Sequence, residues 1–83
     1  MAQSLSFKNP VPVTPDDDND ISTRPTDGIR VNATGTVKLT WESGRTGTYL
    51  MLGGVDYYWA IKRVWSTDTD ANVIAAGIDA LYL

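Results

Sequence analysis

Aspartate is the residue type in this chain whose spacing could do chemistry. Asp16, Asp18 and Asp20 occupy alternate positions, which is the spacing of the first ligands in a calcium loop. Such a loop also needs glycine at its sixth place and glutamate at its twelfth, where this chain has Ile21 and Asp27, and no helical pattern flanks it. Two other interpretations stay open, namely a solvated turn or carboxylates that pair with arginines of a partner. We favour pairing across a subunit contact and expect no metal and no cofactor.

The residue types on which most enzymes depend are missing. The chain has no histidine and no cysteine, which excludes the commonest general base, thiolate nucleophiles and thiolate metal sites. A serine nucleophile needs a base held within reach, and no motif marks one. A glycosidase-like carboxylate pair needs a cleft, which a chain of 83 residues could form only between subunits. We therefore expect a protein that is not an enzyme.

Charge and hydropathy restrict the partners. Ten acidic residues stand against seven basic ones, for a formal charge of −3. A nucleic-acid-binding domain would present a basic surface to phosphates, so no nucleic-acid partner is expected. No apolar run approaches the roughly 20 residues that span a bilayer, and the first ten residues lack the apolar centre of a signal peptide, so no membrane association is expected. Because small domains without disulfides or metals often gain stability by association, a homo-oligomer assembled in the cytoplasm is favoured.

Aromatic residues are numerous for so short a chain, with three tryptophans and four tyrosines. Most of them are expected in the core, but a domain of this size cannot bury them all. Tryptophan and tyrosine are enriched at protein interfaces, so we expect Tyr58 or Trp59 to lie in a subunit contact. An alternative is a carbohydrate-binding module that stacks sugars on exposed aromatics such as Trp59 or Trp65.

The first 26 residues differ in composition from the rest. All four prolines lie there, and proline lacks the amide that a ladder needs and pushes its predecessor toward extended geometry. We interpret residues 1–26 as an extended arm and not as a strand of a central sheet. Deleting residues 1–25 is expected to leave a soluble core. The apolar side chains that could dock on a neighbouring subunit are Leu5, Phe7, Val11, Val13 and Ile21, and the acids expected in that contact are Asp16, Asp18 and Asp20.

Residues 27–83 alternate between apolar and polar side chains in several short runs. The pattern predicts strands over 28–32, 36–41 and 46–52, a loop over 66–72 and a last strand from about Gly77. Turns with a glycine at positive φ are expected at Gly35 and Gly44. Residues 55–67 are the richest in aromatic and β-branched types and are expected to form one central strand, with a β-bulge near Lys62 and Arg63. Together these elements predict an all-β fold, either a small antiparallel β-sandwich or a barrel.

Three stretches together resemble a known protein family. They are V-T-P-D-D-D-N-D-I at 13–21, the glycine-punctuated segment 28–39, and R-V-W-S-T at 63–67 leading to A-A-G-I-D-A-L-Y at 75–82. They resemble the small head spike base proteins of gene transfer agents and related tailed phages. The pattern of that family is an arm of the form V-T-P-x-D-x-x-D-L, the motif R-V-x-A-T and a terminal G-I-x-A-L-Y. This chain departs from the pattern at Trp59 and in residues 68–72.

The resemblance covers most of residues 11–83 and implies a bacteriophage virion structural protein on the outer surface of the capsid. Such a protein would oligomerise there as a head spike base or as a decoration (cement) protein. The implied partners are the major capsid protein and further copies of the chain, as a trimer or pentamer, with a spike fibre protein as an additional candidate. Besides the carbohydrate-binding module, a tail or baseplate adaptor remains an alternative.

Overall fold

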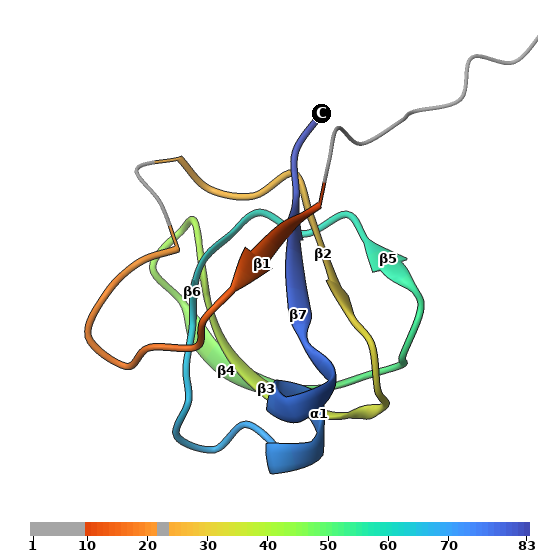
Figure 1. Ribbon diagram of the computed structural model, residues 1–83. Coiled ribbons are helices and arrows are strands. Elements are labelled where there is room, and N and C mark those ends of the chain that lie inside the picture. Colours follow the sequence, from red (N-terminus) through yellow and green to blue (C-terminus); the bar gives the residue numbers. More distant parts are fainter. Residues whose placement is uncertain (1–9, 22–23) are drawn as a thin grey trace, which may run out of the picture.

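The computed structural model describes residues 10–21 and 24–83 and shows two antiparallel sheets packed face to face (Figure 1). One sheet has the strand order β1-β7-β2-β5, and the other has the order β4-β3-β6. The predicted all-β fold is confirmed, in the form of a sandwich. The elements are β1 (Val11–Val13), β2 (Gly28–Val31), β3 (Gly35–Trp41), β4 (Thr46–Met51), β5 (Asp56–Tyr57), β6 (Ile61–Val64), α1 (Ala71–Ala76) and β7 (Ile78–Leu81).

The core lies between the two sheets and is built by the alternation seen in the sequence. Ile29 and Val31 of β2 are fully buried, while Arg30 between them is only partly buried. Val37 and Leu39 of β3 face them from the other sheet and are also fully buried. Each such side chain contributes about 1.5–3 kcal/mol on burial. The two alternating strands that the sequence marks most clearly therefore supply opposite halves of one core.

The stretch 55–67 does not form one central strand, which corrects the prediction. β5 pairs with β2 in one sheet and β6 pairs with β3 in the other, so residues 58–60 cross between the sheets. A strand that switches sheets and a continuous strand both bury alternate side chains, so the local pattern is the same for both. The predicted bulge is confirmed, because Thr40 pairs with Arg63 and Trp41 with Ile61, which leaves Lys62 as the extra residue.

The two predicted glycine turns have different outcomes. Gly44 has a φ of 92° in the hairpin between β3 and β4, as predicted. Gly35 has no positive φ and opens β3, because β2 and β3 belong to different sheets. A Cβ at Gly35 would lie 2.5 Å from Cγ2 of Val73 in α1, so glycine serves the close approach of the helix there.

The predicted C-terminal strand is confirmed as β7. No helix within the described ranges is long and apolar enough to cross a membrane.

The described part of the predicted arm packs against the sandwich. β1 pairs with β7 as an edge strand, not a central one. Beyond it, the backbone N–H groups of Asp16 and Ile21 donate to the carbonyls of Val64 (2.9 Å) and Lys62 (2.7 Å), which covers the outer edge of β6. Val13 and Ile21 also pack against the core. Removing residues 1–25 would uncover the edges of β6 and β7, and the expectation that this deletion leaves a soluble core stays a prediction.

Candidate functional site

The acidic loop of residues 16–20 is anchored by Asp17, which the sequence analysis did not single out. Its carboxylate accepts hydrogen bonds from the backbone N–H groups of Ser66 (2.8 Å) and Thr67 (3.0 Å) and from both of their hydroxyls. The Thr67 hydroxyl and the backbone donors lower the pKa of Asp17 to about 2. Arg63 also donates to the Asp17 carbonyl (3.1 Å). Asp17 therefore fastens the N-terminal segment to the turn that follows β6.

The acids that were predicted to contact a partner have different neighbours within the chain. They are Asp16, Asp18 and Asp20. The Asp16 carboxylate accepts from the side chain of Asn19 (2.9 Å) and the N–H of Asp18 (2.8 Å), and these bonds lower the pKa of Asp16. Asp20 forms an ion pair with Arg63 at 3.0 Å. The expectation that these acids pair with arginines of a partner stays a prediction, and for Asp20 the arginine described here belongs to the same chain. Among the residues that the structure describes, no group of three or more acidic side chains could hold a metal ion.

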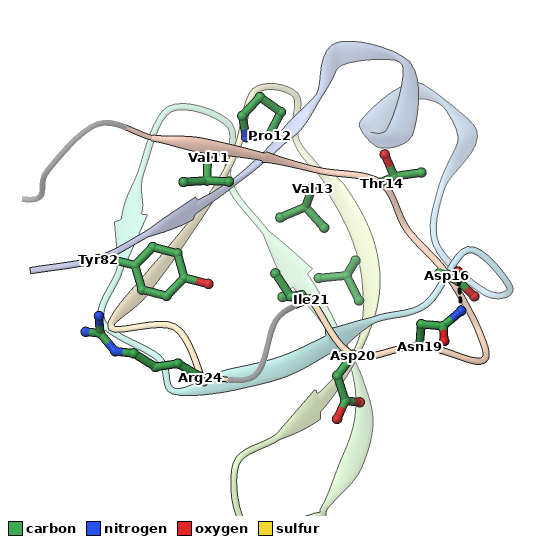
Figure 2. A pocket seen from close by; sticks show the side chains of 11 residues that line it. Val11, Pro12, Val13, Thr14, Asp16, Asn19, Asp20, Ile21, Arg24 and Tyr82 are labelled. Atoms are coloured by element: carbon green, nitrogen blue, oxygen red, sulfur yellow. Dashed lines mark hydrogen bonds between the residues drawn. The ribbon is translucent and has the colours of Figure 1, made fainter.

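A groove of about 540 Å³ opens on the flank where β1 and β6 lie (Figure 2). Three parts of the chain that are distant in sequence enclose it: β1 with the loop that follows, Val64 of β6, and Tyr82 after β7. The guanidinium of Arg24 lies 5.0 Å from the centre of the Tyr82 ring at the rim. Five of the predicted contact residues line this groove, namely Val11, Val13, Asp16, Asp20 and Ile21.

The groove is apolar in the middle and charged at its ends. Figure 2 shows the side chains of Val13 and Ile21 between a carboxylate end, with Asp16 and Asp20, and an opposite end with Arg24. This described lining can bind a ligand by covering its apolar part and pairing with its charge. Its shape and polarity suit an extended, largely apolar peptide that carries a positive charge toward the carboxylate end.

Trp59 lies in an aromatic cluster within the chain. Its ring centre is 4.6 Å from that of Tyr57, 5.1 Å from that of Trp41 and 5.8 Å from that of Tyr49. The indole N–H of Trp41 donates to the hydroxyl of Tyr49 (3.0 Å), which fixes the relative orientation of those two rings. The half-buried Trp59 packs against the core, whereas its neighbour Tyr58 is 56% exposed. Of the two aromatics predicted to form a contact, Tyr58 has the more accessible side chain.

Trp65 is held on the outer face of the second sheet by polar and charged neighbours. Its indole N–H donates to the hydroxyl of Thr40 (2.9 Å). The Lys38 ammonium lies 4.2 Å from its ring centre, and the Arg63 guanidinium lies 5.7 Å from it. These two cation–π contacts occupy the ring surface that a stacked sugar would use.

A second surface is formed by residues 50–58, which we call the apolar stretch. It contains four exposed apolar or aromatic side chains: Leu50 (68% exposed), Leu52 (52%), Val55 (41%) and Tyr58 (56%). The stretch begins in β4, an edge strand of one sheet, and runs through β5, an edge strand of the other. It therefore lies on the flank of the sandwich opposite the groove. Leu5 and Phe7, which were also predicted to dock on a neighbouring subunit, lie outside the described residues.

No family model, no curated protein and no solved structure matches this chain. The groove and the apolar stretch are therefore the features from which its function has to be argued.

Proposed function

We propose that this chain is a bacteriophage virion structural protein that self-associates on the outer surface of the capsid, as a head spike base or a decoration protein. The observation that carries the proposal is the exposed apolar stretch. Its leucines, Leu50 and Leu52, stand more than half exposed. Four large exposed apolar or aromatic side chains within nine residues of sequence favour a segment that contacts another protein. The motif resemblance supports a virion protein as the specific class.

The edge strand β4 supports self-association further. Soluble proteins usually protect a sheet edge with charged side chains, proline or a covering loop. β4 has the sequence T-G-T-Y-L-M, without charge or proline. β1, on the other flank, contains Pro12, and residues 16–21 cover β6. An unprotected edge beside exposed leucines favours burial of this flank in an assembly.

The partners in this proposal are the major capsid protein and further copies of the chain, in a trimer or pentamer assembled in the host cytoplasm, with a spike fibre protein as a further candidate. The carbohydrate-binding alternative has less support, because Trp59 and Trp65 are engaged by neighbouring side chains of the chain itself. A tail or baseplate adaptor would use the same apolar stretch. Binding to isolated tails instead of capsids would distinguish it.

The proposal is tested with Leu50→Ser, using Ile74→Ser as the matched control. Ile74 is an exposed apolar residue of α1, outside the apolar stretch. Full burial of a leucine is worth about 1.5–3 kcal/mol, so burying the 68% of Leu50 that is exposed would contribute about 1–2 kcal/mol for each copy. Leu50→Ser should then weaken capsid binding and self-association by about 5–30-fold, with Ile74→Ser close to the unmodified chain.

The measurements are sedimentation velocity for the oligomeric state and co-sedimentation with capsids stripped of the protein. A chain that stays monomeric at high concentration and fails to bind capsids would refute the proposal. Equal binding by the two variants would remove the apolar stretch as its basis.

A further inference from the structure

We propose that the groove between β1, residues 16–21 and Tyr82 receives residues 5–8 of a second copy of this chain, so that neighbouring subunits exchange N-terminal segments. This inference deepens the proposed function and depends on it only for self-association. It gives the groove a specific occupant and uses the flank opposite the apolar stretch.

The carboxylates at one end of the groove suit a ligand with a positive charge. Asp20 is paired with Arg63. Asp16 accepts hydrogen bonds from Asp18 and Asn19, but the described part of the chain gives it no ion pair. An aspartate carboxylate is ionised at neutral pH, and those two hydrogen bonds lower the pKa of Asp16 further below its usual value. One end of the groove therefore presents a negative charge without a described counter-charge.

The middle of the groove is apolar and suits apolar side chains of a ligand. Val13, Ile21 and Val64 line it, and all three belong to or pack against the core. Val11, at the rim, is 45% exposed. A ligand that laid one or two large apolar side chains over this surface would remove it from water at about 25 cal/mol per Å² of apolar area.

Residues 5–8 of the chain, L-S-F-K, have this combination in order. In an extended segment Leu5 and Phe7 point to the same side, since side chains alternate with a period of two. Lys8 follows directly and can carry its ammonium group toward Asp16. Of the chain's seven basic residues, Lys8 and Lys62 directly follow an apolar pair with this spacing, and the pair before Lys62, Trp59 and Ile61, already packs in or against the chain's own core.

A second copy, and not the same copy, is indicated by the sequence N-P-V-P at residues 9–12. Each proline pushes the residue before it, here Asn9 and Val11, toward extended geometry. Pro12 also removes a donor from the open edge of β1, so a segment that folded back on this edge would lack a ladder bond. Both effects disfavour a reversal onto the chain's own groove. Residues 1–8, when extended, span roughly 26 Å, which is enough to reach a neighbour.

The test is disulfide exchange between two single-cysteine variants of the full chain, which has no cysteine of its own. One variant carries Lys8→Cys, which removes the ammonium group and leaves Leu5 and Phe7 in place, so that selective reaction in this pair reports the apolar contact alone. The other carries Thr14→Cys, an exposed position on the rim of the groove, activated as a mixed disulfide. Ser43→Cys, exposed in the turn between β3 and β4, is the matched control for Thr14→Cys.

With both chains at about 10 μM, docking would raise the local thiol concentration toward the millimolar range. The Lys8→Cys chain should therefore react with the Thr14→Cys chain about 100-fold faster than with the Ser43→Cys chain. Adding Phe7→Asp to the Lys8→Cys chain should abolish the difference, since a carboxylate would then face the apolar surface of the groove. The product should have the mass of two chains on a non-reducing gel.

Equal rates at Thr14 and Ser43 would overturn the inference. Capsid binding is measured separately on the unmodified chain. Capsid binding without selective cross-linking would refute only the exchange, and selective cross-linking without capsid binding would refute only the proposed function.

Discussion

Thr26 is the residue whose substitution tests the account of the fold most sharply. It is 2% exposed and lies between the N-terminal segment and β6. Its hydroxyl donates to the carbonyl of Trp59 (2.8 Å) and accepts from the N–H of Ile61 (3.0 Å). Its backbone N–H donates to the Ile61 carbonyl (2.9 Å). The perturbation is Thr26→Val, which keeps the shape of the side chain and removes both hydroxyl bonds.

The expected magnitude follows from the two groups that lose their partner. Ile61 is fully buried, so its N–H would be left without an acceptor at a cost of about 1–3 kcal/mol. The carbonyl of the half-buried Trp59 would lose a bond worth about 0.5–1.5 kcal/mol. The free energy of unfolding should fall by about 2–4 kcal/mol, from a total of roughly 4–12 kcal/mol for a chain of this length.

Two variants serve as controls. Thr26→Ser keeps the hydroxyl and removes one methyl group, so it should cost about 1 kcal/mol. Thr48→Val makes the same chemical change at an exposed position of β4 and should stay within about 0.5 kcal/mol of the unmodified chain.

The assay is urea unfolding at one fixed protein concentration, because self-association would make stability depend on concentration. With a slope of about 1 kcal/mol per M, the midpoint of Thr26→Val should fall by about 2–4 M. If Thr26→Val were no more destabilising than Thr26→Ser, the hydroxyl would not hold these strands together, and the reasoning would be refuted.

Two further predictions concern the loop anchor and the helix contact. Because the folded pKa of Asp17 is lowered from 3.8 to about 2, its carboxylate stabilises the fold above pH 3.8, and that contribution is lost as the pH falls toward 2. Asp17→Asn should therefore lower the Tm at neutral pH and flatten its decline between pH 3.8 and 2; an unchanged decline would contradict this. Gly35→Ala should cost about 1–3 kcal/mol by crowding Val73, and less in a Val73→Ala background, whereas additive effects in urea unfolding would exclude the contact.

The parts of the fold that could be predicted depend on contacts close in sequence. The alternation in β3, the turn at Gly44 and the bulge at Lys62 were all predicted, because each leaves its mark within a few residues. The sheet switch at residues 58–60 could not be predicted. Which sheet β5 and β6 join depends on their pairing with β2 and β3, 20 or more positions earlier in each case.

Some residues of the candidate site could likewise be selected from the sequence, and others could not. Val11, Val13, Asp16 and Asp20 were selected for their types and line one groove. Asp17 stands among them and was passed over, because the calcium-loop spacing pointed to its neighbours. Its donors at Ser66 and Thr67 lie 49 and 50 positions away. A serine–threonine pair in a turn is rich in donors, but nothing local shows which carboxylate it binds.

The two flanks of the sandwich are different, and this constrains the assembly. One flank has β1 with Pro12, the covered edge of β6 and the groove; the other has the open edges of β4 and β5 and the apolar stretch. A two-fold dimer would use the same patch on both subunits and leave one flank unused. If each copy inserted its N-terminal segment into the groove of the next, the contact would be head-to-tail, and such contacts close into rings when the rotation between copies allows it. A two-fold dimer that exchanged its segments reciprocally would also fill both grooves, but only through the groove flank of each copy. The proposed trimer or pentamer would fill every groove and leave the other flank for a further contact, and a two-fold dimer held only by the apolar stretch would contradict this argument.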